Sequence, residues 1–368
     1  MKIARVDTRW IVVPFDHRGP ATTGFGGRPF ANMQTLLVEI ETDGGIVGYG
    51  EIFGHNAIPS ARAALETLVK PFLIGRDARE IQPLMLELQR TNHNFGRYGQ
   101  TLFAISGVDT ALWDIAGKAA GLPLWRMLGG AAVERMPAYA SLMRYGELDF
   151  VETRTAEAAA AGYEYVKLHE RTPEAVEAAR VGGGAGVKIM VDTNCPWTPA
   201  EAIEIGDAMA DYGVHWLEEP VWPPENFDGL AEVRAKGMCP IAAGENASTA
   251  WEFQKMFQAG AVDWAQPSVA KVGGVTETRK ISVLAEAANV GLALHSPYFG
   301  PGFVASMHLL AAHNGAKAPV ERLYGKLEAS LYGDLFEPDE TGRLRMPTGP
   351  GLGVDPDPDV MRAFVMTE

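Results

Sequence analysis

Four carboxylates stand at the ends of three predicted strands that follow one another along the chain. Asp192 ends the segment VKIMVD, Glu218 and Glu219 end VHWLEE, and Glu245 ends PIAAGE. Parallel strands deliver such residues to one rim, where their negative charges repel one another unless a cation neutralises them. An all-oxygen ligand set favours Mg²⁺ over Zn²⁺. The alternative is that these acids cap the helices that follow each strand.

Basic side chains flank the three acidic strand ends. The preceding predicted strand ends in Lys167-Leu168-His169, and strand alternation places Lys167 and His169 on the same face. A cation nearby disfavours the ammonium form of Lys167, which predicts a lowered pKa for this group. His295 ends the seventh predicted strand, across the barrel. A cation with a base on each side is what proton removal from the carbon next to a carboxylate requires.

Glu321 ends the eighth predicted strand, PVERLY, and two roles are open for it. It could exchange a proton near a substrate carboxylate, or it could cap a helix. Two other function classes also stay open for the whole set. Lys167 could form a Schiff base in an aldolase-like barrel that needs no metal. Alternatively, the barrel could bind a metal and a ligand without turnover.

The elements that must position these residues alternate regularly from Met136 onward. Short apolar strands are followed by helical stretches, and polar residues end the strands at positions 167, 192, 218, 245, 268, 295 and 321. With the earlier segment PAYASLM the pattern gives eight strands, the number that closes a (β/α)₈ barrel. The glycines of Gly182–Gly186 precede a strand, unlike the phosphate loop of a doubly wound sheet. We therefore predict an α/β fold with a (β/α)₈ barrel of the TIM type.

The first hundred residues follow a different pattern, typical of a small α+β domain. Strands, a turn and a helix are predicted at Lys2–Val13, Thr35–Glu41, Asp43–Gly45, Ile46–Glu51 and Thr101–Ala120. The region from His17 to Phe30 is rich in Gly and Pro and predicts a binding loop or lid. We expect the α+β domain at 1–125, the barrel at 126–330, and a tail at 331–368 that returns to the first domain.

Composition excludes several classes of partner. The chain has 368 residues and a formal net charge of −14, so binding to nucleic acid or to an anionic lipid surface is disfavoured. Two cysteines are too few for a disulfide framework and fit a reducing compartment. The amino-terminal segment has no signal-peptide pattern, and no apolar run reaches the length of a membrane helix. These features predict a cytoplasmic enzyme that acts on a small molecule.

Three segments resemble the enolase superfamily, in its mandelate racemase and muconate lactonising enzyme group. They are AISGVDTALWDIAGKAAGLPLWRMLGG at 104–130, VEIETDGGIVGYGE at 38–51 and GPGLGVD at 349–355. The resemblance implies that both termini form a capping domain over a modified barrel. It also implies one Mg²⁺ per subunit on Asp192, Glu218 and Glu245, and removal of the proton α to a carboxylate through an enediolate intermediate. The resembling enzymes are usually multimers, so we expect a homo-oligomer.

The acid/base residues depart from the pattern of that group. His169 stands where the family usually has the second lysine of a Lys-x-Lys pair. Ser268 stands where the racemases have an aspartate that partners a histidine, and His295 comes about two residues earlier than the usual histidine. Without that aspartate, His295 lacks the group that raises its basicity and fixes its tautomer. We therefore expect His295 to serve better as a general acid than as a base.

Dehydration of a sugar acid is the predicted reaction, with Lys167, His169, His295 and Glu321 as catalytic candidates. Cycloisomerisation of a lactone or anhydro-sugar acid, racemisation and epimerisation use the same first step and stay open. Which of Lys167 and His169 is the base also stays open. The predicted substrate contacts are His17, Arg18, Thr22, Arg28, His55, Asn194 and Ser268.

Overall fold

The structure is a computed structural model that describes residues 1–20, 24–25, 28–315 and 317–366. Its first part is an antiparallel sheet of β1 (Ile3–Asp16), β4 (Asn32–Thr42) and β5 (Val47–Ile52), with the short β14 (Lys326–Leu327) paired to β1. One face of this sheet carries α1 (Ile58–Ala64), α2 (Ile81–Thr91) and α3 (Gly99–Ala120). The strands, turn and helix predicted for this region are confirmed.

Glycine lets β5 approach α3 closely. A Cβ atom at Gly48 or Gly50 would collide with the backbone of Ala111 or Gly107 on α3. Apolar side chains from β4 and α3 fill the rest of the interface, among them Leu36, Val38, Ile105 and Val108. A two-stranded pair of β2 (Gly24–Phe25) and β3 (Arg28–Pro29) lies in the predicted loop region.

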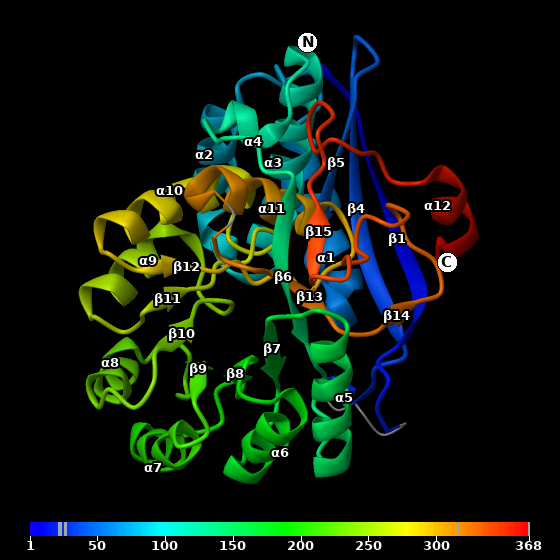
Figure 1. The fold of residues 1–368 in the computed structure, drawn as a ribbon. Helices are drawn as coiled ribbons and strands as arrows, with labels where there is room; N and C mark the ends of the chain where they lie inside the picture. The colour runs from blue at the N-terminus through cyan, green and yellow to red at the C-terminus, as the bar shows by residue number, and fades with distance from the viewer. Residues whose placement is uncertain (21–23, 26–27, 316, 367–368) are drawn as a thin grey trace.

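The second part is the predicted series of parallel strands. It contains β6 (Arg135–Ser141), β7 (Tyr165–Leu168), β8 (Lys188–Asp192), β9 (Val214–Glu218), β10 (Ile241–Ala243), β11 (Trp264–Ala265), β12 (Gly291–Leu292) and β13 (Val320–Leu323). Hydrogen bonds run in the order β13-β6-β7-β8-β9-β10-β11-β12, and the sheet curls as Figure 1 shows. In the described part of the chain β12 and β13 do not pair, so the barrel is a modified one. The predicted fold class is confirmed.

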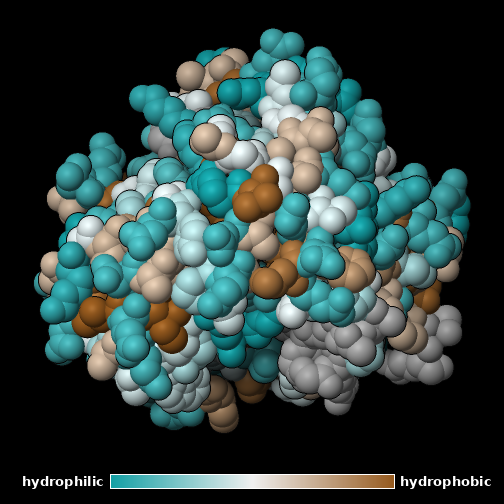
Figure 2. Space-filling model, turned by 60° about the horizontal axis from the view of Figure 1, so that its bottom comes forward, coloured by the Kyte–Doolittle hydropathy of each residue, from teal (hydrophilic) through white to brown (hydrophobic). Residues whose placement is uncertain are grey.

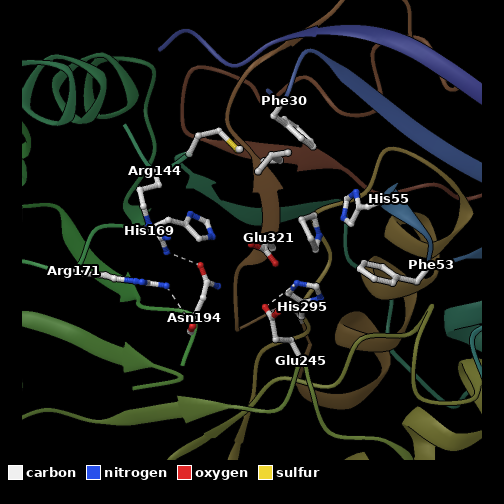
Figure 3. Close-up of a pocket in the computed structure, with 13 residues that line it drawn as sticks. Phe30, Phe53, His55, Arg144, His169, Arg171, Asn194, Glu245, His295 and Glu321 are labelled. Atoms are coloured by element: carbon white, nitrogen blue, oxygen red, sulfur yellow. Dashed lines mark hydrogen bonds and ion pairs between the residues drawn. The ribbon is translucent and has the colours of Figure 1, made fainter. Parts of the chain in front are cut away.

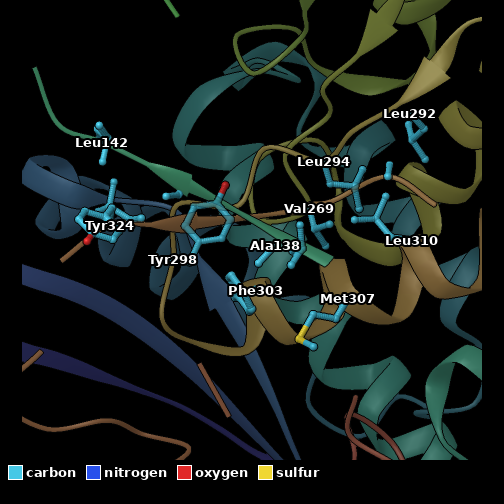
Figure 4. Close-up of a cluster of buried hydrophobic side chains, with 14 of the residues drawn as sticks. Ala138, Leu142, Val269, Leu292, Leu294, Tyr298, Phe303, Met307, Leu310 and Tyr324 are labelled. Carbon is cyan, nitrogen blue, oxygen red and sulfur yellow. The ribbon is translucent and has the colours of Figure 1, made fainter. Parts of the chain in front are cut away.

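Helices cover the outer face of the curled sheet, each in the crossover between two strands (Figure 1). They are α5 (Leu148–Ala160), α6 (Pro173–Gly183), α7 (Pro199–Ala210), α8 (Phe227–Ala235), α9 (Thr249–Gln258), α10 (Gly274–Ala287) and α11 (Pro301–Asn314). The short α4 (Leu124–Met127) precedes β6. Figure 4 shows apolar side chains of β6, of the loops after β11 and β12, and of α11, including Phe303 and Met307, gathered in one buried cluster.

The last segment returns to earlier parts of the chain. β15 (Arg343–Arg345) pairs antiparallel with β6, and α12 (Pro358–Phe364) leads to Val365, which bridges to Ile11 on β1. Among the described residues, no helix has both the length and the apolar composition that crossing a membrane requires. The face drawn in Figure 2 is largely hydrophilic, with small separate hydrophobic areas.

Candidate active site

A cavity of about 330 Å³ opens at the carboxyl ends of the parallel strands. Phe30, Phe53 and His55 reach it from the N-terminal sheet and its loops, and polar residues of the barrel line the remainder (Figure 3). The polar lining residues are Arg144, His169, Arg171, Asn194, Glu245, His295 and Glu321. Because barrels build their active sites at this end of the strands, the cavity is the candidate site.

Asp192, Glu218 and Glu245 converge next to this cavity, and Glu245 lines it. Asp192 ends β8, Glu218 ends β9, and Glu245 lies just beyond β10. One ligand oxygen from each carboxylate lies within 4.8 Å of the others. Met190 and Trp216 pack inside the barrel two residues before Asp192 and Glu218, so the strand period of two carries both acids inward.

Other residues cap the following helices, so the alternative of helix capping is wrong for these acids. The side chain of Thr198 caps α7, that of Asn226 caps α8, and α9 begins after Ser248. Three converging carboxylates in a nearly dry site form the oxygen donor set that Mg²⁺ prefers. The residues present therefore fit a divalent cation. Glu219 is not in the cluster, and both of its oxygens accept hydrogen bonds from Asn246.

Lys167 lies beneath the cavity, in contact with three carboxylates. Its Nζ is 2.8 Å from Glu321 Oε1, 3.0 Å from Glu218 Oε1 and 3.3 Å from Asp192 Oδ2. Burial alone would lower the pKa of Lys167, but these carboxylates outweigh it and raise the pKa well above its ordinary value. The expectation of a lowered pKa is therefore not met by the protein's own groups. Lys167 is 1% exposed and does not line the cavity.

Burial and charge act in opposite directions on the clustered acids. Burial raises the pKa of Glu218, and Asp192 adds to this effect, so the pKa is well above its ordinary value. Burial also opposes ionisation of Glu245, but the nearby His295 outweighs it and lowers the pKa to about 2. The pKa of Asp192 falls for the corresponding reason, because Lys167 and His169 outweigh its burial. Two of the three acids are therefore held in the ionised form that binds a cation.

His169 faces the cavity from the end of β7. Its Nε2 lies 3.3 Å from Asp192 Oδ2, and its Nδ1 contacts the backbone carbonyl of Leu142. Because a carbonyl only accepts, Nδ1 carries the proton in that contact and Nε2 is the nitrogen that faces the carboxylates. The predicted common orientation of Lys167 and His169 is confirmed, with His169 the member of the pair that lines the cavity.

His295 lies across the cavity from His169 (Figure 3). Its Nε2 is 3.0 Å from Glu245 Oε2, and its Nδ1 is 3.1 Å from Ser268 Oγ. The hydroxyl of Tyr298 contacts Ser268 Oγ and lies 3.4 Å from His295 Nδ1. Ser268 thus does occupy the place of a histidine partner, as a neutral hydroxyl. Ser268 is fully buried and does not line the cavity, so its role as a substrate contact stays a prediction that this position does not support.

Glu321 lines the cavity from within β13 and is held on both carboxylate oxygens. Its Oε1 accepts from Ser141 Oγ at 2.9 Å as well as from Lys167, and its Oε2 accepts from the backbone N–H of Ser296 at 2.9 Å. Burial would raise the pKa of Glu321, but Lys167 and then His295 outweigh it and lower the pKa. The helix-cap alternative is wrong here too, since Ser296 belongs to a loop.

The predicted contacts from the N-terminal domain do not all lie at the cavity. His55 lines the cavity, and burial, followed by the charge of His295, lowers its pKa to about 4. His17 and Arg18 do not line it: Arg18 donates to Tyr324 Oη at 2.7 Å and pairs with Glu157 at 2.8 Å. The structure does not place these two residues in the cavity wall, and their role as substrate contacts stays a prediction. Thr22 and the side chain of Arg28 lie outside the described part of the chain.

Two positively charged cavity residues were missed in the sequence. Arg144 follows the first barrel strand, and Arg171 lies two residues beyond His169. The alternation that places Lys167 and His169 on one face extends to Arg171, so the period of two was a usable signal for it. Asn194 is a predicted contact that does line the cavity, where its Nδ2 donates to Asp192 Oδ1 at 2.9 Å.

Comparisons with known proteins agree with this architecture. Residues 6–129 match the N-terminal domain family of mandelate racemase and muconate lactonizing enzyme, and residues 151–360 match the enolase C-terminal domain-like family. The chain is 33% identical to a D-galactarolactone cycloisomerase from Agrobacterium fabrum, with 100% of each chain covered. It is also 33% identical to an arabinonate dehydratase from Saccharolobus solfataricus, over 87% of this chain and 88% of that protein.

A solved structure gives the same result for the fold. The crystal structure of a racemase from Streptomyces coelicolor A3(2) with bound magnesium matches with a TM-score of 0.85 and 27% identity. The match covers 99% of this chain and 100% of that chain. The cap-and-barrel architecture, the carboxylate cluster and these matches lead to one assignment. The chain belongs to the enolase superfamily, in its mandelate racemase and muconate lactonizing enzyme group.

Proposed function

We propose that this chain is a Mg²⁺-dependent lyase that removes the proton α to the carboxylate of a sugar acid and eliminates a hydroxyl as water. The observation that carries the proposal is the position of two imidazoles against the carboxylate cluster. His169 Nε2 lies 3.3 Å from Asp192, and His295 Nε2 lies 3.0 Å from Glu245. A substrate held at the cluster therefore has a proton-transfer group on each side.

Asp192, Glu218 and Glu245 would hold the Mg²⁺, one ion per subunit. When bound, the ion supplies positive charge that stabilises the substrate carboxylate while its α-carbon loses a proton. The substrate class is supported by the relative named as an arabinonate dehydratase. Asn194 and His55 line the cavity and would contact the substrate, and Glu321 would exchange a proton or share a hydrogen bond near its carboxylate.

We assign the base to His169 rather than to Lys167, because His169 lines the cavity and Lys167 does not. His169 Nε2 accepts the α-proton, and the electron pair of the C–H bond forms the new C=C bond. The β C–O bond breaks, and His295 gives a proton to the leaving hydroxyl, which departs as water. The enol that remains takes a proton on its β-carbon and gives up the proton of its hydroxyl, and so becomes the 2-keto acid. Lys167 holds the carboxylates in place from below.

Cycloisomerisation is the second candidate. It is supported by the relative named as a D-galactarolactone cycloisomerase, which this chain matches over the full length of both chains. The same proton leaves, but the group expelled from the β-carbon is the ring oxygen of a lactone or anhydro-sugar. The protein groups and their positions are the same in both reactions, and racemisation or epimerisation would return the proton to the α-carbon.

Other properties of the protein remain proposals of the same kind. We propose a homo-oligomer in the cytoplasm that acts on a small carboxylate and not on nucleic acid or membranes. The division into a cap at 1–125, a barrel at 126–330 and a returning tail at 331–368 is also a proposal. The pairing of Val365 with Ile11 supports the return of the tail.

Proton NMR in D₂O tests the reaction directly. The purified protein with Mg²⁺ is incubated with mono- and dicarboxylic sugar acids and their lactones, and α-deuterium incorporation and new products are followed. We expect exchange and a 2-keto product, both lost after metal removal by chelation. Stabilisation by Mg²⁺ without exchange of any acid would contradict the proposal and favour a barrel that only binds. An adduct trapped by borohydride without metal would favour Schiff-base chemistry at Lys167 instead.

A further inference from the structure

Arg144 and Arg171 form a pair of cations in the cavity wall opposite Phe53 and His55, with Asn194 between them (Figure 3). Arg144 donates from Nε to the His169 carbonyl at 2.5 Å and from Nη2 to Asn194 Oδ1 at 2.9 Å. Arg171 donates from Nε to the Thr193 carbonyl at 2.9 Å and from Nη2 to the Asn194 carbonyl at 3.5 Å. All of these acceptors are neutral.

Neither guanidinium forms an ion pair with a carboxylate of the residues that the structure describes. Glu170 is the acid whose charge most affects the pKa of Arg144. Its Oε1 accepts hydrogen bonds from the backbone N–H groups of Tyr145 and Gly146. Burial, and then the like charge of Arg171, lower the pKa of Arg144. Two cations that repel each other and lack a carboxylate partner are therefore held in the wall of a pocket for an acidic substrate.

Most other arginines that the structure places near carboxylates are neutralised by them. Arg18 pairs with Glu157, and Arg322 pairs with Glu337. Arg180 also has only carbonyl acceptors, but Arg144 and Arg171 differ from it because they line a cavity that a ligand can fill. A guanidinium has five N–H donors in a planar fork that matches the two oxygens of a carboxylate, and each cavity arginine has donors beyond those used by the neutral acceptors.

We propose that Arg144 and Arg171 bind a second carboxylate, at the end of the substrate away from the reacting carbon. The substrate is then a sugar dicarboxylic acid, or a lactone of one whose ring opening releases the second carboxylate. This inference rests on the proposed function, because it places the reacting carboxylate at the Asp192 cluster. Asn194 joins the two sites, since its side chain accepts from Arg144 and donates to Asp192.

The test uses pairs of molecules that differ only at the far end. Binding to the Mg²⁺-loaded protein is measured by calorimetry for adipate and for 6-hydroxyhexanoate, which has a hydroxyl in place of one carboxylate. We expect adipate to bind about 30-fold more tightly or better, as charge-assisted hydrogen bonds allow. That advantage should fall to a few-fold in Arg144→Gln and in Arg171→Gln. Arg126→Gln, an exposed residue outside the cavity, is the matched control and should keep it.

Turnover gives the second readout, with galactarate, its lactone and galactonate. We expect a preference of at least about 30-fold in kcat/KM for the diacid or the lactone over galactonate, and its loss in the two arginine variants. A preference for the lactone over the diacid would show that the site receives the carboxylate released on ring opening. Turnover with equal use of galactonate would overturn this inference and leave the proposed function intact. An adipate preference that depends on both arginines, without turnover of any acid, would overturn the proposed function instead and keep the anion site.

Discussion

The two sides of the carboxylate cluster are built differently. On the first side, Lys167 and His169 stand at the end of β7, which is hydrogen-bonded to strands on both sides. On the second side, β11 and β12 are only two residues long, and Ser268 and His295 lie in the loops beyond them. The first side is therefore positioned by regular strand geometry, and the second by contacts between side chains.

The hydrogen-bond partners of the two imidazoles make the difference concrete. Nδ1 of His169 contacts the backbone carbonyl of Leu142, a partner that no side-chain substitution removes. Nδ1 of His295 instead contacts the hydroxyls of Ser268 and Tyr298. His169 is therefore held by the backbone, whereas the position of His295 depends on particular side chains and is open to change by single substitutions.

Loss of a carboxylate from the cluster should abolish the proton transfers of both His169 and His295. In Glu218→Gln we expect turnover to fall at least about 10³-fold, because the stabilisation of developing charge is lost. Stabilisation of the protein by Mg²⁺ in thermal unfolding should fall with it. The variant keeps an oxygen that can accept from Trp216 Nε1, so it should still fold. Glu232→Gln, on the exposed face of α8, is the matched control, and equal losses in both variants would argue against a metal role for Glu218.

Substitutions of the two histidines should affect proton removal and product formation differently. In His169→Asn we expect both α-deuterium exchange and product formation to fall by about 10²–10⁴-fold, as loss of a general base does. In His295→Asn the product should be lost to a similar degree while exchange continues, because the α-proton is taken on the other side. NMR in D₂O measures both rates in one experiment. The reverse pattern would exchange the assigned roles, and the exposed His93→Asn serves as control.

A smaller effect is expected from loss of Ser268, the side-chain partner of His295. Ser268→Ala removes the hydroxyl 3.1 Å from His295 Nδ1, and we expect kcat to fall by about 10–100-fold, as is typical when the partner of an active-site histidine is lost. Exchange at the α-carbon should change far less than product formation. Ser268→Thr keeps a hydroxyl and should restore much of the activity. Equal losses of exchange and product would show that Ser268 supports the whole site rather than His295.

The smallest effect is expected on the free energy of unfolding, at Glu51 in the N-terminal sheet. Glu51 on β5 accepts from the backbone N–H of Gly302 at the start of α11, and burial raises its pKa to about 8. In the unfolded chain Glu51 loses its proton at about pH 4. The free energy of unfolding therefore decreases as the pH rises from about 4 to about 8. Glu51→Gln removes this decrease and keeps an acceptor.

We therefore expect Glu51→Gln to be more stable than the parent protein by about 2–4 kcal/mol above pH 8. The difference should shrink toward zero near pH 4, where Glu51 is protonated in both the folded and the unfolded state of the parent protein. Urea unfolding at pH 5 and pH 8.5 measures the two values. A difference that does not depend on pH would contradict a buried, titrating Glu51.

Prediction from the sequence succeeded where the period of two applies. The three acids were found because each ends an apolar strand, and Lys167 and His169 because they alternate on one strand. In the loop of residues 17–30 no periodicity relates one side chain to the next, and the structure does not bring His17 or Arg18 to the cavity. Arg18 there turns to Tyr324 and Glu157, partners far away in the sequence. Type and charge alone could not distinguish it from Arg144 and Arg171, which do line the cavity.

The sequence by itself determined the fold class, the order of the parallel strands and the identity of the carboxylate cluster. It did so because strand period, strand spacing and residue type are local properties that chain geometry converts directly into position. Tertiary structure alone decided which cations meet the cavity and which hydroxyl holds His295. Those contacts join Ser268 to Tyr298 and Arg144 to Asn194 across separate strands and loops, where packing rather than spacing sets the distance.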